Sequence, residues 1–291
     1  MPEQPRARRF TTADGLTLVA DEWAPPGDPA DAPVVLMAHG GGQTRHAWGG
    51  TADALARSGW RAISIDQRGH GDSDWSAQGR YGIETFGADL REIARSFERP
   101  PAMVGASLGG VAALIAAGEA DAPVFSAIVL VDITPRVERS GVERIINFMS
   151  ANKDEGFATL EEAADAIAAY IPNRPRPKDL SGLEKNLRRR PDGRWRWHWD
   201  PKFITDIDAR VADRDPERLE AAARRIAQPI LLVRGKSSDL VTEEAARALL
   251  EIAPNARYVD VSGAGHMVAG DRNDIFTRAV TEFLGEAHGQ R

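Results

Sequence analysis

The chain alternates short, continuously apolar runs with stretches of helical periodicity, and this alternation restricts its fold more than any other feature. A strand that is apolar at nearly every position is buried on both faces, as in a parallel sheet covered by helices. The alternation therefore predicts an α/β fold with a doubly wound, mostly parallel sheet. The expected strands are Val34–Ala38, Arg61–Asp66, Ala102–Ala106, Phe125–Asp132, Pro229–Arg234 and Ala256–Val261.

Helical spacing of apolar residues marks the segments between these runs. At the beginning of the chain, residues 1–9 are expected to fray. Apolar alternation on both sides of Asp14-Gly15 then predicts a β-hairpin with a type I′ turn. The expected helices are Trp48–Ser58, Ile83–Phe97, Ser107–Gly118, Glu243–Ile252 and Asp274–Leu284.

One segment interrupts the alternation. Between Asp132 and Pro229, roughly 95 residues carry helical patterns without a convincing buried strand, and a structureless loop of that length is improbable in a compact domain. We therefore expect an inserted helical cap over residues 135–226, with residues 1–134 and 227–291 forming the core.

Three tryptophans in this insertion alternate at strand spacing, so that Trp195, Trp197 and Trp199 would face one side of an extended segment. Large aromatic side chains form pocket walls and also pack domains together. Two interpretations therefore stay open: Trp197 and Trp199 bind substrate in the roof of a pocket, or they pack the cap against the core.

Composition excludes several classes of protein. The absence of cysteine removes disulfides, thiol nucleophiles and thiolate metal sites. With 37 basic and 43 acidic residues the formal net charge is −6, which argues against nucleic acid as a partner.

No apolar run approaches the ~20 residues that span a bilayer, and the first residues lack the apolar core of a secretory signal. We expect a cytoplasmic protein without membrane contact that acts on a small molecule. No metal-ligand spacing appears, so we expect no metal; no oligomeric state is indicated.

The segment Val104–Gly110 (VGASLGG) lies directly after an expected strand and before an apolar helix. A nucleophile at such a turn has strained backbone angles, and small residues two before and two after it avoid a clash with neighbouring backbone. The following helix N-terminus supplies amide donors for an oxyanion. The pattern predicts Ser107 as a nucleophile, with the Leu108 amide as one oxyanion donor.

Two further loops follow expected strands. The run His39-Gly40-Gly41-Gly42 lets backbone amides approach a ligand, and we expect the Gly41 amide to be the second oxyanion donor, with His39 in a structural role. After the last strand, a glycine-flanked His266 can reach the Ser107 hydroxyl as a general base.

Together these motifs resemble the alpha/beta-hydrolase fold superfamily, and the run Asp66–Ser73 (DQRGHGDS) is similar to that superfamily's D-x-R-G-x-G-x-S loop. The resemblance covers residues ~8–132 and ~229–285 and implies a Ser–Asp–His order of catalytic residues. Two carboxylates fit that order. Asp239, after the strand Pro229–Arg234, has the commoner family position and is our preferred acid; Asp132 is the alternative.

The resemblance implies a serine hydrolase that cleaves a carboxylic ester, or a related acyl bond, of a small and fairly apolar substrate without a cofactor. Other chemistries are compatible with the same residues. A cofactor-free haloperoxidase would form a peracid, and a carbon–carbon bond hydrolase would act on dienoic ring-cleavage products. Some members of the superfamily are ligand receptors with slow or absent turnover. Fold alone does not choose among these functions.

Overall fold

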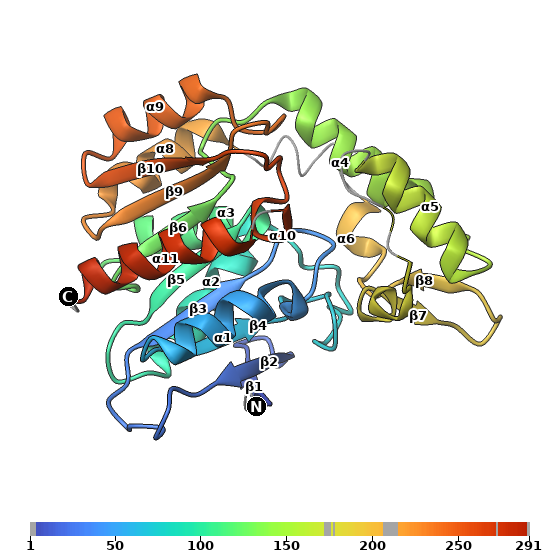
Figure 1. Ribbon diagram of the computed structural model, residues 1–291, viewed down its shortest axis with the longest axis horizontal. Helices are drawn as coiled ribbons and strands as arrows, with labels where there is room; N and C mark the ends of the chain where they lie inside the picture. The colour runs from blue at the N-terminus through green and yellow to red at the C-terminus, as the bar shows by residue number, and fades with distance from the viewer. Residues whose placement is uncertain (1–3, 172–175, 177, 206–214, 272, 290–291) are drawn as a thin grey trace.

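The computed structural model describes residues 4–171, 176, 178–205, 215–271 and 273–289 (Figure 1). Its centre is a sheet with the strand order β1-β2-β4-β3-β5-β6-β9-β10. All neighbours from β4 to β10 pair in parallel, whereas β2 pairs antiparallel with both β1 and β4. The predicted doubly wound sheet is confirmed. The strands are β1 (Arg6–Thr11), β2 (Thr17–Trp23), β3 (Val34–Ala38), β4 (Arg61–Ile65), β5 (Ala102–Ala106), β6 (Ile128–Val131), β9 (Ile230–Gly235) and β10 (Ala256–Val261).

Helices cover both faces of this sheet, because the strand side chains are apolar in both directions. Trp48, Leu55 and Phe276 belong to the cluster on one face, beneath α1 and α11, which lie side by side in Figure 1. The opposite face is covered by α2, α3, α8 and α9. No helix among the described residues has the length and apolarity needed to cross a membrane. The core helices are η1 (Arg45–Trp48), α1 (Gly49–Arg57), α2 (Ile83–Arg95), α3 (Leu108–Gly118), α8 (Pro216–Arg225), α9 (Glu243–Ile252), α10 (Val268–Asp271) and α11 (Asn273–Ala287).

The N-terminal hairpin forms, but it differs from expectation in two respects. Strand β1 begins inside the segment expected to fray, because Arg6 pairs with Glu22 of β2. The pairing ends at Thr11 and Thr17, which leaves a loop longer than two residues, and Gly15 has a φ of +84° while Asp14 is not in the positive region. The predicted type I′ turn is therefore wrong, since that turn needs positive φ at both central residues.

The inserted segment follows β6 and lies beside the sheet, outside the two helical layers (Figure 1). It has an apolar cluster of its own, centred on Phe157, Leu187 and Trp197. It is not wholly helical, because β7 and β8 form a small antiparallel sheet. Its elements are α4 (Arg139–Ala151), α5 (Leu160–Tyr170), η2 (Ser181–Lys185), β7 (Leu187–Arg189), β8 (Trp195–Trp197) and α6 (Lys202–Thr205).

Helix α8 packs differently from the rest of the segment expected to form the cap. Leu219 and Ala223 are buried in the core cluster, and α8 lies against α3. We therefore propose a cap that ends before α8, rather than at residue 226, since this helix covers the sheet like the other core helices.

Candidate active site

Ser107 is at the turn between β5 and α3, with φ +45° and ψ −109°. L-residues rarely adopt this conformation, which costs on the order of 1–3 kcal/mol. The turn also needs glycine on both sides: a Cβ on Gly105 would lie 2.5 Å from the Gly109 carbonyl oxygen, and one on Gly109 would lie 2.5 Å from that of Ala38. The structure thus contains the strained strand-to-helix turn that the sequence pattern predicts.

Asp132 follows β6, the strand adjacent to β5, and it too has a positive φ, +48°. Its carboxylate is fully buried. One oxygen, Oδ2, accepts hydrogen bonds from the Nδ1 atom of His266 at 2.7 Å and from the Ser238 hydroxyl at 2.6 Å. The other, Oδ1, accepts from the Gly235 amide at 3.0 Å. This arrangement keeps the His266 proton on Nδ1, so that Nε2 is the ring nitrogen able to act as a base.

The loop after β10 brings His266 to this carboxylate by crossing the end of β9. The Ser237 amide donates to the Ala264 carbonyl oxygen at 3.0 Å, which joins the two loops. At Gly235 any Cβ would collide with the Gly265 carbonyl oxygen. A glycine at the end of β9 is therefore required for the His266 loop to lie where it does.

The structure corrects the preference for Asp239 as the acid. The Asp239 carboxylate forms an ion pair with Arg144 of α4 at 2.8 Å, and its side chain is 40% exposed. The turn between β9 and α9 contributes to the site in another way, because its Gly235 amide and Ser238 hydroxyl donate to Asp132. Asp132, the alternative acid, is the residue that contacts His266.

The glycine loop after β3 lies against Ser107: a Cβ on Gly40 would be 3.4 Å from the Ser107 Cβ. The Gly40 amide donates to Gln43 Oε1 at 3.0 Å, and the Gly42 amide donates to His70 Nε2 at 3.1 Å. Among hydrogen bonds between described residues, the Gly41 amide has no acceptor. It is thus the amide of this loop that can donate to a ligand.

Leu108 is the first residue of α3, and its amide is one of those that a helix leaves without an intrahelical acceptor. On the other side of the site, the Gln43 side-chain amide approaches the Met267 sulfur at 3.2 Å, so the glycine loop also contacts the His266 loop. The structure therefore brings together the regions of Ser107, Gly41, Leu108 and His266.

Three buried histidines surround the glycine loop, and the sequence motifs predict a structural role for only one of them, His39. The ring centroids of His39 and His70 are 5.1 Å apart, and those of His70 and His198 are 5.9 Å apart. Burial lowers the pKa of His39 to about 4 and that of His70 to about 3, and it also lowers the pKa of His198. All three imidazoles are neutral near pH 7. His198 belongs to the cap, and no local sequence motif indicates that it lies beside the glycine loop.

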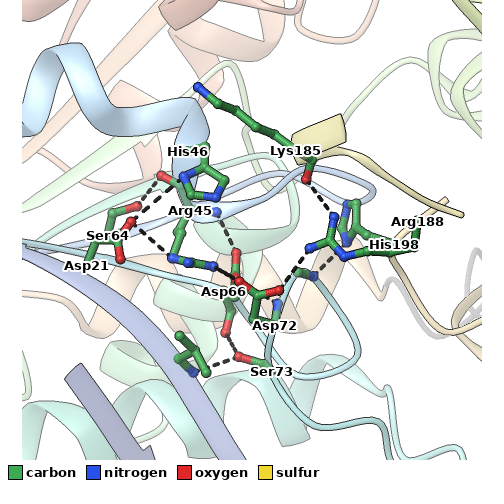
Figure 2. Close-up of polar contacts among 12 residues, drawn as sticks. Asp21, Arg45, His46, Ser64, Asp66, Asp72, Ser73, Lys185, Arg188 and His198 are labelled. Carbon is green, nitrogen blue, oxygen red and sulfur yellow. Dashed lines mark hydrogen bonds and ion pairs between the residues drawn. The ribbon is translucent and has the colours of Figure 1, made fainter. Parts of the chain in front are cut away.

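The loop Asp66–Ser73 is held by charged groups, as Figure 2 shows. Arg45 contacts the carboxylates of Asp21, Asp66 and Asp72, and Arg188 of the cap contacts Asp72 at 2.9 Å. These contacts agree with a structural role for the charged residues of this loop. Within the described parts of the chain, no three His, Asp or Glu side chains are grouped so as to hold a metal ion.

The second charged residue of this loop, Arg68, is buried. It forms two hydrogen bonds of 2.6 Å with Asp89 of α2 and also contacts Asp14 in the N-terminal hairpin. Bidentate pairs of this kind fix orientation as well as charge. The loop is therefore tied to two other elements of the core.

The tryptophans of the cap occupy different surroundings. Trp197 is buried inside the cap, with its ring edge-on to Phe148 and Phe157 at 5.7 and 5.3 Å. Trp199 lies nearer the site, because its indole nitrogen is 3.6 Å from the position of a Cβ on Gly42. These positions favour packing for Trp197; substrate contact by Trp199 stays a prediction.

Phe203 of α6, which the sequence analysis did not single out, also lies beside the glycine loop. Its ring is 3.4 Å from the position of a Cβ on Gly41 and packs edge-on to His70 at 4.7 Å. The cap thus places an apolar ring next to the amide that can donate to a ligand.

Comparison with known proteins agrees with this fold. Residues 33–272 match the family model described as alpha/beta hydrolase fold. Esterase Rv0045c from Mycobacterium tuberculosis is 33% identical to this chain, over 83% of the chain and 79% of its own length. The 3-hydroxybutyrate-oligomer hydrolase of Cupriavidus necator is 29% identical, over 84% of this chain and 85% of its own.

Solved structures give the same result. The crystal structure of E-2-(acetamidomethylene)succinate hydrolase matches with a TM-score of 0.83 and 25% identity, covering 96% of this chain and 99% of that one. The resemblance noted from the sequence motifs is therefore confirmed. The chain belongs to the alpha/beta hydrolase fold family, and it is a hydrolase.

Proposed function

We propose that the protein is a serine esterase that cleaves a carboxylic ester of a small, fairly apolar substrate through an acyl-enzyme at Ser107. The observation that carries this proposal is the hydrogen bond of 2.7 Å from His266 Nδ1 to the buried Asp132 carboxylate. A buried acid that orients an imidazole is what a serine nucleophile needs for activation. That two relatives are an esterase and an oligomer hydrolase agrees with this chemistry.

In this mechanism the Ser107 oxygen attacks the ester carbonyl while His266 Nε2 takes its proton. The Gly41 and Leu108 amides donate to the oxyanion that forms, and Asp132 stabilises the imidazolium without accepting its proton. When the tetrahedral intermediate collapses, the same proton passes from His266 to the leaving alcohol. Water then attacks the acyl-enzyme with His266 as base, which releases the acid and restores the Ser107 hydroxyl.

The surroundings of the glycine loop support an apolar substrate. Phe203 lies against Gly41, while Met149 of α4 and Trp199 lie against Gly42. The Met149 sulfur is 3.4 Å from the position of a Cβ on Gly42. Apolar side chains from the cap therefore surround the loop that would bind the oxyanion, which suits an apolar substrate.

A panel of nitrophenyl esters of increasing acyl length tests the function. We expect hydrolysis with an optimum at short chains, and a loss of kcat on the order of 10⁶ in the Ser107→Ala variant, the scale known for removing a serine nucleophile in subtilisin. A folded Ser107→Ala protein that keeps a tenth of the activity would contradict the proposal. Peroxide-dependent peracid formation faster than ester hydrolysis would favour a perhydrolase instead.

A further inference from the structure

Three imidazoles each hold one peptide group of the glycine loop: His39 directly precedes the glycines, whereas His70 and His198 come from distant parts of the chain. His39 Nδ1 contacts the Gly40 carbonyl oxygen at 2.8 Å. His70 Nε2 accepts from the Gly42 amide at 3.1 Å, and His198 Nε2 contacts the Gly42 carbonyl oxygen at 3.1 Å. Because the carbonyl of one residue and the amide of the next form a single plane, these contacts hold three consecutive peptides.

The second nitrogen of each ring determines the tautomer, since a backbone amide can only donate and a carbonyl can only accept. His39 Nε2 accepts from the Gln67 amide at 3.1 Å, so its proton is on Nδ1. His70 donates from Nδ1 to the Arg68 carbonyl oxygen at 3.0 Å. His198 Nδ1 accepts from the Gly71 amide at 2.6 Å, so its Nε2–H donates to the glycine loop.

The orientation of the Gly41 amide depends on these contacts. It belongs to the peptide whose carbonyl is held by His39, and in a trans peptide the amide points away from the carbonyl. The next two peptides are held by His70 and His198. The loop therefore cannot turn its Gly41 amide aside without breaking the buried hydrogen bond from His39 to the Gly40 carbonyl oxygen.

His198 differs from the other two imidazoles because it belongs to the cap, and its own position is well anchored. The ring is 1% exposed. Two residues later, the Asp200 amide donates to the Gly69 carbonyl oxygen at 2.8 Å, and the Tyr81 hydroxyl donates to the Asp200 carboxylate at 2.5 Å. This part of the cap is therefore joined to the core on the side next to the glycine loop.

We infer that His198 is a positioning residue for the oxyanion hole, so that the cap completes the catalytic geometry of the core by holding the carbonyl of Gly42. The inference rests on the proposed function, in which the Gly41 amide binds the oxyanion. It gives the cap a part in the rate of the reaction, in addition to any part in selecting the substrate.

Steady-state kinetics of His198→Ala on a short-chain nitrophenyl ester test this inference. Misplacing one oxyanion donor costs less than the roughly 10²–10³ loss for removing it, so we expect kcat to fall about 10- to 100-fold with KM within about threefold. His198→Gln keeps an amide N–H near the position of Nε2, which donates to the Gly42 carbonyl oxygen. His198→Asn replaces only the acceptor at Nδ1, so we expect the Gln variant to have the higher kcat of the two. These two variants carry the test if His198→Ala does not fold.

Arg188→Gln is the matched control. It removes a different contact between the cap and the core, the ion pair with Asp72 in the Asp66–Ser73 loop, and leaves the hydrogen bond between His198 and Gly42 in place. We expect its kcat to stay within about twofold of wild type. An unchanged kcat in folded His198→Ala, or an equal loss in Arg188→Gln, would overturn the inference. Failure of the proposed function would appear separately, as an active Ser107→Ala protein.

Discussion

His266 Nδ1 lies 2.7 Å from Asp132 Oδ2, although the two residues are far apart in the chain and lie on loops after β10 and β6. The contact crosses the end of β9, which separates these two strands in the sheet. The proposed acid, Asp132, thus follows the strand next to the Ser107 strand, and the loop after β9 donates to its carboxylate from the Ser238 hydroxyl and the Gly235 amide.

The two candidate acids should separate clearly in a kinetic comparison. Asp132→Asn should lower kcat by on the order of 10⁴, because an amide favours the wrong imidazole tautomer, as the corresponding Asp→Asn substitution does in a serine protease. Asp239→Asn removes only the ion pair with Arg144, which is partly exposed, and should keep kcat within a few-fold. Both variants are checked for folding by circular dichroism. An inactive Asp239→Asn protein beside an active Asp132→Asn protein would reverse the assignment.

The glycine before the Ser107 turn should tolerate no side chain. Gly105→Ala places a Cβ 2.5 Å from the Gly109 carbonyl oxygen, and we expect a loss of about 1–3 kcal/mol in the free energy of unfolding. Gly49→Ala is the matched control, since a Cβ there meets no atom within 4 Å and the residue is helical. Denaturant unfolding measures both. Equal stability of the two variants would show that the turn can relax.

Phe203 should limit the acyl chain, because its ring lies beside the Gly41 amide. In Phe203→Ala we expect the optimum of the ester panel to move to longer chains. Trp197→Ala is the comparison: this ring packs inside the cap, so its loss should cost about 3–5 kcal/mol of stability and leave chain-length preference unchanged. A shifted preference in a folded Trp197→Ala protein, with none in Phe203→Ala, would exchange their roles.

Stability should fall below about pH 6.5. The pKa of His39 is lowered to about 4 and that of His70 to about 3, and the pKa of His198 is also lowered, so these rings stay neutral while an unfolded chain takes up protons. Their contribution is therefore complete above pH 6.5 and is lost as pH falls, by up to about 1.4 kcal/mol per pH unit for each ring. Asp89, whose pKa burial raises to about 6, acts in the opposite direction.

Burial also lowers the pKa of His46 and of His288, so five imidazoles oppose the Asp89 carboxyl. The free energy of unfolding should therefore be lower at about pH 5 than at about pH 7. Urea unfolding at the two pH values measures this difference, and His70→Gln should show a smaller one than wild type. A protein that is equally stable at both values would contradict neutral, buried imidazoles.

Local pattern was sufficient for most of the sheet and for the turn at Ser107. Buried parallel strands are apolar at every position, so Val34–Ala38 and Ala102–Ala106 have the predicted bounds. Gly105 is needed for a contact within the same short segment, with the Gly109 carbonyl oxygen, and Gly109 is needed because the Ala38 carbonyl oxygen of β3 lies close to it. Both glycines flank Ser107 in the chain, which is why the motif is visible in the sequence. In the cap, the tryptophan spacing predicts an extended segment where β8 lies, but no pattern predicts β7 or the pairing of the two strands, because both are short and only partly buried.

Contacts between residues far apart in the chain cannot be predicted from local sequence patterns. Both Asp132 and Asp239 lie between Ser107 and His266 in the chain, so chain order does not distinguish them. Asp132 contacts His266 because the His266 loop crosses the end of β9 and reaches the loop after β6. His198 contacts Gly42 across the boundary between cap and core. No residue spacing in the sequence indicates that His198 contacts Gly42, so this contact is visible only in the folded structure.

Intact-protein mass spectrometry after reaction with a fluorophosphonate, followed by peptide mapping of the adduct, tests whether Ser107 is an activated nucleophile. We expect one adduct on Ser107, which is absent from Ser107→Ala. Labelling should slow strongly in Asp132→Asn and hardly in Asp239→Asn. Labelling at another residue, or no labelling of a protein that hydrolyses esters, would contradict a Ser107 nucleophile activated by His266 and Asp132.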